Sequence, residues 1–151
     1  MKNIFIAFGH HNTKNSFNAS IRDTFIEEAQ KCGHSIDLVN LFDEQEKLPF
    51  YNQNINPPPQ LVLDYRKRLE KCDVMMLIGS CNNLRLNAIL ENWIDWVLHP
   101  KWFFTYRSLL PGNKYFKNYG YPVAGAMKGK LGVVSITSVS YTHLRAHETS
   151  L

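Results

Sequence analysis

The sequence predicts an α/β domain in which an open parallel sheet carries helices on both of its faces. Short apolar runs at residues 4–8, 74–78 and 131–137 have the length of strands that are buried on both sides. Segments with helical apolar spacing lie between these runs, so strands and helices alternate along the chain. The first two runs end at a glycine that opens a polar segment, which is the composition of a turn.

The size and composition describe one globular domain. The chain has 151 residues, of which 44% are hydrophobic and 20% are charged, and this balance excludes a disordered protein. The apolar runs are too short for a membrane span or a signal peptide, so we expect a cytoplasmic location. Three scattered cysteines without a Cys-x-x-Cys pair argue against a disulfide framework and against a zinc site.

The net charge of +4 raises the possibility of a nucleic-acid partner. The densest basic cluster, residues 66–68, is followed at once by Leu69 and Glu70, and we interpret it as the solvated face of a helix. A mildly basic protein equally favours an anionic small molecule.

The first strand leads into a polar turn and then into the start of a helix. Gly9 ends the strand, and the run from Gly9 to Asn15 has the composition of a turn. Ser16 is a good N-cap, because its hydroxyl can accept a hydrogen bond from an amide two or three residues later. A helix N-terminus at the end of such a loop is suited to an anion. An ordinary connection between strand and helix is the alternative reading.

The helix that follows ends near Gly33, which stands where a C′ glycine belongs. We expect its buried stripe to be Phe17, Ile21, Phe25, Ala29 and Cys32. Residues 36–41 form the second predicted strand, so the first third of the chain is a βαβ unit with a right-handed crossover.

The remaining elements follow in order. Residues 48–60 predict an irregular surface loop, and residues 61–71 predict a second helix. Residues 86–97 predict an amphipathic helix whose apolar face, near Trp93 and Trp96, packs on the sheet, on a partner subunit, or on both. The aromatic residues 102–106 are expected to cover a pocket or the edge of the core. Residues 109–130, rich in glycine, predict a long excursion before the last strand.

Polar residues follow three strands on what should be one side of the sheet. They lie at residues 9–18, at residues 79–84 and from Thr137 onward. Ligands of open parallel sheets bind outside the carboxyl ends of the strands, so this edge is the predicted site.

Several motifs in this order resemble the NAD(P)H:quinone oxidoreductase family, which has a flavodoxin-like fold. The resemblance covers residues 2–138, and the segments that carry it are Gly9-His10, Ser16-Phe17-Asn18, Gly33-His34, Ala88-Ile89-Leu90, Trp93-Ile94-Asp95, Phe104-Thr105-Tyr106 and Met127-Lys128-Gly129-Lys130. It implies a homodimer that holds FAD or FMN at the sheet edge and reduces quinone-like acceptors with NAD(P)H. Some family members are ancillary subunits of potassium-efflux systems, so a non-catalytic regulatory subunit is the alternative.

The resemblance also implies which residues bind the flavin. They are His10, Ser16, Phe17 and Asn18 for the phosphate arm, Ser80, Cys81, Asn82, Asn83 and Leu84 for the ring, and Thr137 and Ser138 for the polar edge of the ring. Amides and small hydroxyls at a helix start suit a phosphate, whereas the ring needs a flat wall and a few donors. Cys81 is either a reactive thiol beside the ring or an inert cysteine.

The sequence departs from the family pattern in two places. Residues 79–85 lack the proline and the aromatic residues that the family usually places beside the ring. Residues 139–151 resemble translated adapter sequence, so we expect a flavin-binding domain at residues 1–138 without the family's last strand and helix, followed by a non-native tail. The catalytic residues of the family then have no counterparts here. No glutamate follows His143, so His143 and His147 do not predict a metal site.

Overall fold

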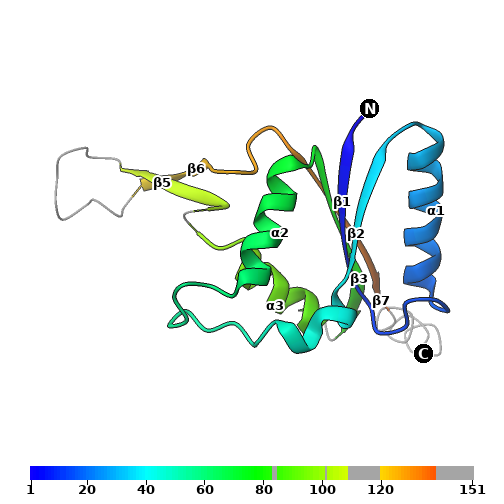
Figure 1. Ribbon diagram of the computed structural model, residues 1–151, viewed down its shortest axis with the longest axis horizontal. Helices are drawn as coiled ribbons and strands as arrows, with labels where there is room; N and C mark the ends of the chain where they lie inside the picture. Colours follow the sequence, from blue (N-terminus) through cyan, green and yellow to red (C-terminus); the bar gives the residue numbers. More distant parts are fainter. Residues whose placement is uncertain (83–84, 101, 109–119, 139–151) are drawn as a thin grey trace, which may run out of the picture.

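Figure 1 shows a computed structural model of the protein, which describes residues 1–82, 85–100, 102–108 and 120–138. Four parallel strands form the main sheet in the order β2-β1-β3-β7: β1 (Asn3–Gly9), β2 (Ser35–Asn40), β3 (Val74–Asn82) and β7 (Leu131–Ser138). The two-residue strand β4 (Arg85–Leu86) runs antiparallel to the end of β3. The predicted α/β fold with an open parallel sheet is confirmed.

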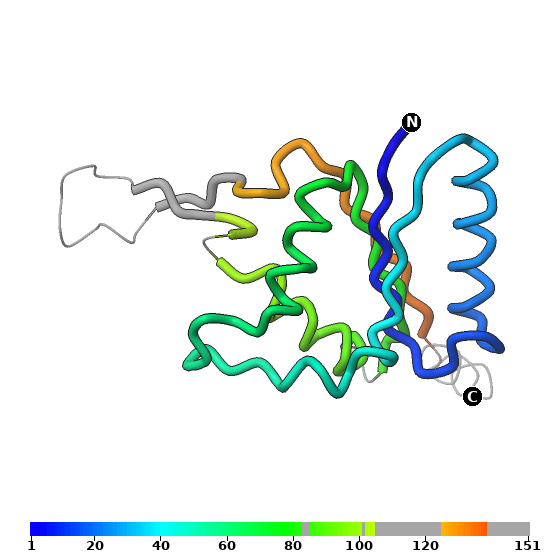
Figure 2. Tube along the Cα trace, in the orientation of Figure 1, coloured from blue at the N-terminus to red at the C-terminus, as the bar shows by residue number. Residues whose placement is uncertain are grey.

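Helices cover both faces of this sheet, as Figures 1 and 2 show. Helix α1 (Phe17–Lys31) lies on one face, and helices α2 (Gln60–Lys71) and α3 (Ala88–Val97) lie on the other. Alternate residues of β1 therefore enter different cores. Ile6 and Phe8 belong to the cluster beneath α1, whereas Phe5 belongs to the cluster beneath α2 and α3.

The ends of α1 are as predicted, and its buried face is so in part, because Ala29 is buried and Phe25 packs against the same core. Ser16 Oγ accepts from the amide of Ala19 at 3.1 Å, and Gly33 has a φ of 75°, which favours glycine. The buried residues are Asn18, Ala19, Arg22 and Ala29. Phe17 is 72% exposed and Cys32 is also exposed, so the stripe that we expected from apolar residues alone is wrong at both ends. Two polar side chains take inward positions instead.

Helix α3 packs on the sheet of its own chain. Trp93 is fully buried and stacks on Phe5 with ring centroids 5.9 Å apart, and Trp96 is 3% exposed. The expectation that this helix packs on the sheet is therefore confirmed for Trp93, whereas Trp96 contacts Tyr51 and the carbonyl of Pro49.

We predicted that the basic cluster at residues 66–68 of α2 is a solvated helix face, and this is wrong for Arg66 and Arg68. Arg66 donates to the carbonyl oxygens of Trp96 and Val97, at 2.8 and 3.1 Å. Arg68 forms a two-pronged ion pair with Asp37 of β2, with one nitrogen–oxygen distance of 2.9 Å. These arginines join α2 to α3 and to the sheet, which leaves them poorly placed to bind phosphates.

The loop predicted at residues 48–60 is irregular up to Gln60, where α2 begins, but other connections are more ordered than predicted. A 3₁₀ helix, η1 (Leu41–Lys47), follows β2 directly and begins at Leu41, which we had placed in the strand. Strands β5 (Phe104–Ser108) and β6 (Gly120–Ala124) pair as an antiparallel hairpin that extends away from the main sheet in Figure 1. Trp102 packs against the core cluster beneath α2 and α3, in line with the expected aromatic cover at residues 102–106, and the long excursion predicted at residues 109–130 includes strand β6. Residues 109–119 lie outside the described part of the chain.

No helix in the described part of the chain has both the length and the hydropathy to cross a bilayer. The strand β7 pairs with β3 alone within this part of the chain, and its Leu131, Val134 and Ile136 are at least half exposed.

We expect Gly79→Ala to lower the free energy of unfolding by about 1–3 kcal/mol, because a Cβ there lies 3.1 Å from Leu90 and 3.2 Å from Asn87. Urea denaturation measures the loss. Gly132→Ala in β7 is the matched control, since nothing lies within 4 Å of its Cβ position. When Gly79→Ala is combined with Leu90→Ala, the double variant should lose less free energy of unfolding than the sum of the two single losses. The shorter side chain at position 90 relieves the clash with the new Cβ. Equal stability of Gly79→Ala and Gly132→Ala would contradict the packing.

Candidate functional site

The carboxyl ends of β1, β3 and β7 meet at one edge of the sheet. Gly9 is level with Gly79, and Ser80 and Cys81 are level with Thr137 and Ser138. The structure thus brings residues of all three predicted segments to the same edge. It differs from the prediction in one respect. Residues 80–82 continue β3 and turn back through β4, so they form a strand where we expected a loop.

The loop between β1 and α1 is organised by Asn12, which the sequence analysis did not select. Its Oδ1 accepts from the amides of Lys14 and Asn15, at 3.3 and 2.8 Å. Its backbone carbonyl accepts from Ser16 Oγ at 2.7 Å, and His10 Nδ1 lies 3.2 Å from both its backbone nitrogen and its carbonyl oxygen. An asparagine two or three residues before such amides is a typical turn signal, so Asn12 was detectable in the sequence.

The loop delivers the chain to the N-terminus of α1 with two amides free. Ser16 provides acceptors for the amides of Ala19 and Ser20. The amides of Phe17 and Asn18 have no partner within the described residues. Together with the helix dipole, free amides of this kind attract an anion. Phe17 is 72% exposed, and it is the backbone amide of this residue that can bind an anion.

A hydrogen bond joins the first and third predicted segments. Asn18 Nδ2 donates to Thr137 Oγ1 at 2.7 Å, across 119 residues of sequence. Asn18 is 3% exposed, and its Oδ1 atom has no partner among the described residues. The hydroxyl of Ser138 is also buried and unpartnered. Buried polar atoms are usually satisfied, so an unsatisfied one on each of these two elements, at the same edge of the sheet, points to a missing ligand.

Arg22 places a buried positive charge beneath the loop. Its side chain is 8% exposed and lies 4.4 Å over the ring of Phe8. Its Nη2 donates to the carbonyl of Thr13 at 2.8 Å and its Nη1 to Asn40 Oδ1 at 3.3 Å, while Asp23 pairs with its Nε. The loop is thereby tied to the end of β2. Sequence reasoning missed Arg22 because a charged residue does not appear in an apolar stripe; its position four residues after Asn18 was the available signal.

Asn87 joins the first and second segments. Its Nδ2 donates to the carbonyl of Gly9 and lies 3.4 Å from Ser80 Oγ, and its Oδ1 caps α3 by accepting from Leu90 at 3.1 Å. Both glycines, Gly9 and Gly79, lie against Leu90 of α3. A single asparagine therefore holds two strand ends and a helix start in one arrangement.

The other predicted residues are spread around this centre. His10, Ser16, Ser80, Cys81, Thr137 and Ser138 are half-buried, whereas Asn82 is exposed. Asn83, Leu84 and the tail at residues 139–151, with His143 and His147, lie outside the described residues. Within the described residues no three His, Cys, Asp or Glu side chains are grouped to hold a metal ion.

The chain matches the model of the flavodoxin-like fold family over residues 2–149, and it belongs to this family. No curated protein matches the sequence.

Solved structures with the same fold include a putative quinone reductase from Klebsiella pneumoniae, with a TM-score of 0.71 and 15% identity over 91% of this chain. An NAD(P)H:quinone oxidoreductase from Methanothermobacter marburgensis has a TM-score of 0.68 and 16% identity over 99% of this chain. An FMN-dependent NADH-azoreductase from Bacillus anthracis, in complex with FMN, has a TM-score of 0.64 and 14% identity over 90%. This chain spans 60%, 70% and 69% of those three proteins.

We expect Arg22→Met to lower the free energy of unfolding by about 1–3 kcal/mol, because the half-buried Thr13 loses the donor to its carbonyl and Asn40 loses its partner. Arg85→Met is the matched control, since that side chain is 76% exposed and its pair with Glu91 is at the surface. Its effect should stay within about 0.5 kcal/mol. Chemical denaturation with unchanged m values measures both, and equal losses would show that Arg22 does not hold the loop.

Proposed function

We propose that this protein is a flavin-dependent oxidoreductase that passes reducing equivalents from NAD(P)H to a quinone-like acceptor. One observation carries the proposal: the helix start at Asn18 and the strand end at Thr137 are joined at 2.7 Å, and the buried Oδ1 of Asn18 has no partner among the described residues. The names of the structural neighbours, quinone reductases and an NADH-azoreductase, support the same class of activity. The proposal includes the homodimer that the family resemblance implies and the cytoplasmic location that the sequence predicts.

The residues present fit the phosphate end of a flavin. The free amides of Phe17 and Asn18 can donate to phosphate oxygens, and the dipole of α1 adds to their attraction. Arg22, which is paired with Asp23, holds the loop in place through the carbonyl of Thr13. The two amides act on the phosphate whether the cofactor is FMN or FAD.

The ring end of the site is formed by residues at the ends of β3 and β7. Ser80 and Thr137 are level with each other, and so are Cys81 and Ser138, so their backbones present one continuous edge. In this proposal these residues bind and orient the ring, and the unpartnered hydroxyl of Ser138 donates to its polar edge. A bound flavin supplies the hydride chemistry itself. No side chain of the described residues is assigned a catalytic role.

A regulatory subunit without turnover is the second candidate. One observation favours it: residues 79–86 contain no aromatic residue that could stack on the ring. Such a subunit would bind a flavin or a partner through the same edge without reducing an acceptor.

The two candidates differ in turnover. The purified chain, loaded with FMN or FAD, should be yellow and should oxidise NAD(P)H when a soluble benzoquinone is added. Absorbance at the flavin and nicotinamide bands measures both properties. Flavin uptake without NAD(P)H oxidation would favour the regulatory subunit, and a chain that takes up no flavin would contradict both flavin-binding versions.

We expect Ser16→Ala to weaken FMN binding by about tenfold, because the loop and the first amides of α1 lose the hydroxyl that holds them. Riboflavin, which has no phosphate, should bind the variant and the wild type equally. Ser20→Ala, one turn later and exposed, is the control. Flavin fluorescence titration gives the dissociation constants, and equal losses for FMN and riboflavin would place the phosphate elsewhere.

A further inference from the structure

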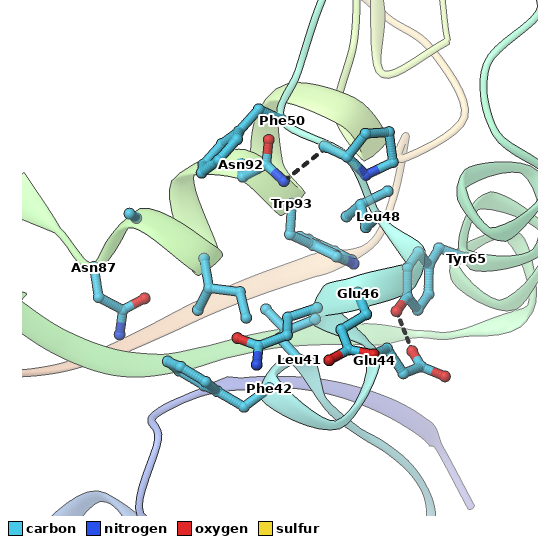
Figure 3. A pocket seen from close by; sticks show the side chains of 14 residues that line it. Leu41, Phe42, Glu44, Glu46, Leu48, Phe50, Tyr65, Asn87, Asn92 and Trp93 are labelled. Carbon is cyan, nitrogen blue, oxygen red and sulfur yellow. Dashed lines mark hydrogen bonds between the residues drawn. The ribbon is translucent and has the colours of Figure 1, made fainter.

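A second cavity lies on the opposite face of the sheet from α1. Its volume is about 520 Å³, which is within the range of small-molecule sites. It lies between η1, the segment after it, α2 and the first turns of α3, and Figure 3 shows its lining: Leu41, Phe42, Glu44, Gln45, Glu46, Leu48, Pro49, Phe50, Tyr65, Asn87, Ala88, Ile89, Asn92 and Trp93. None of the described residues that line it is a predicted flavin contact.

The floor of this cavity contains a hydrogen-bond donor without an acceptor. Trp93 is fully buried, and its Nε1 has no partner among the described residues. In Figure 3 the nitrogen is at the end of the indole nearest Tyr65, whose ring lies 5.8 Å away in an edge-on arrangement. A buried donor that lacks an acceptor is destabilising, so a ligand acceptor that reached it would stabilise the complex. The Trp93 Nε1 atom is closed to solvent, so a ligand contacts it only when the side chains that cover it move aside.

The charge of the lining has one sign. Glu44 is held at the wall by the hydroxyl of Tyr65, which donates to its Oε2. Burial and this carboxylate both raise the pKa of Tyr65, so its hydroxyl keeps its proton at neutral pH. Glu46 lies nearby and is exposed. No lysine, arginine or histidine is found among the described lining residues.

We propose that this cavity binds a small aromatic cation, namely a flat apolar ring system with a positively charged amine and a ring atom that accepts a hydrogen bond. The apolar side chains of Phe42, Leu48 and Phe50 contact the ring system. Glu44 and Glu46 attract the amine, and the indole Nε1–H of Trp93 donates to the ring acceptor. The same carboxylates repel phosphates, so the ligand is of a different class from the flavin.

This cavity is separate from the proposed flavin site, but its lining residues contact the strand end and the loop beside that site. Asn87, which lines the cavity, also donates to the carbonyl of Gly9. Phe42 lies against His11, with ring centroids 6.2 Å apart, and His11 stacks on His10 at 4.5 Å. Binding in the cavity does not require a flavin, so the test uses the full chain without one.

Three probes of similar size separate the contributions. They are an aminomethyl-quinoline, an aminomethyl-naphthalene that lacks the ring acceptor, and a quinoline carboxylate of opposite charge. Isothermal titration should show the aminomethyl-quinoline binding about fivefold more tightly than the naphthalene and at least about tenfold more tightly than the carboxylate. The preference for the cation over the carboxylate should shrink in high salt.

Two variants identify the contacts. Glu46→Gln should weaken both amines by about two- to fivefold and leave the preference of quinoline over naphthalene unchanged. Trp93→Phe should remove that preference and leave the preference for cations unchanged. Asp95→Asn, on the same helix but outside the lining, is the control and should change neither.

Three results would overturn the proposal. They are equal binding of the amine and carboxylate probes, an amine affinity that Glu46→Gln leaves unchanged, and a quinoline preference that survives in a folded Trp93→Phe variant. A melting curve establishes whether that last variant is folded. The Glu46→Gln comparison tests the site by itself if it is not.

Discussion

The close approach of α3 to the ends of β1 and β3 is the constraint on which the rest of the structure depends. Leu90 lies directly against Gly9 and Gly79, where a Cβ on either strand would be 3.1 Å away. The same approach lets Asn87 reach the carbonyl of Gly9 while it caps its own helix. Because a helix and two strands are held at one point, the polar edge of the sheet and the wall of the second cavity share a single frame.

On the other face, buried polar side chains replace apolar ones near the edge of the sheet. Arg22 and Asn18 take inward positions on α1, and each reaches a segment far away in the sequence. Burying a charge costs free energy unless it is paired and hydrogen-bonded, and Arg22 is both. This polar layer stabilises the loop that begins α1 and leaves two of its amides free for a ligand.

The two faces of the sheet therefore present opposite electrostatics within one small domain. The side of α1 offers free amides at a helix start, which suit an anion, whereas the cavity beside α3 offers Glu44 and Glu46, which suit a cation. His10, His11 and Phe42 form a row of ring contacts between them. The two proposed ligands would be bound by different residues, and Asn87 links the two places through the carbonyl of Gly9.

The sequence by itself determined the alternation of strands and helices, the cap at Ser16 and the turn at Gly33, because these depend on periodicity and on backbone preferences within a few residues. Only the tertiary structure decided which side of α1 is buried, that residues 80–82 extend β3, and that Arg68 pairs with Asp37. The hydrogen bond from Asn18 to Thr137 spans 119 residues, and no local pattern encodes it. Contacts between distant segments turn a recognisable loop into a candidate site, because burial and partners are set by the packed fold.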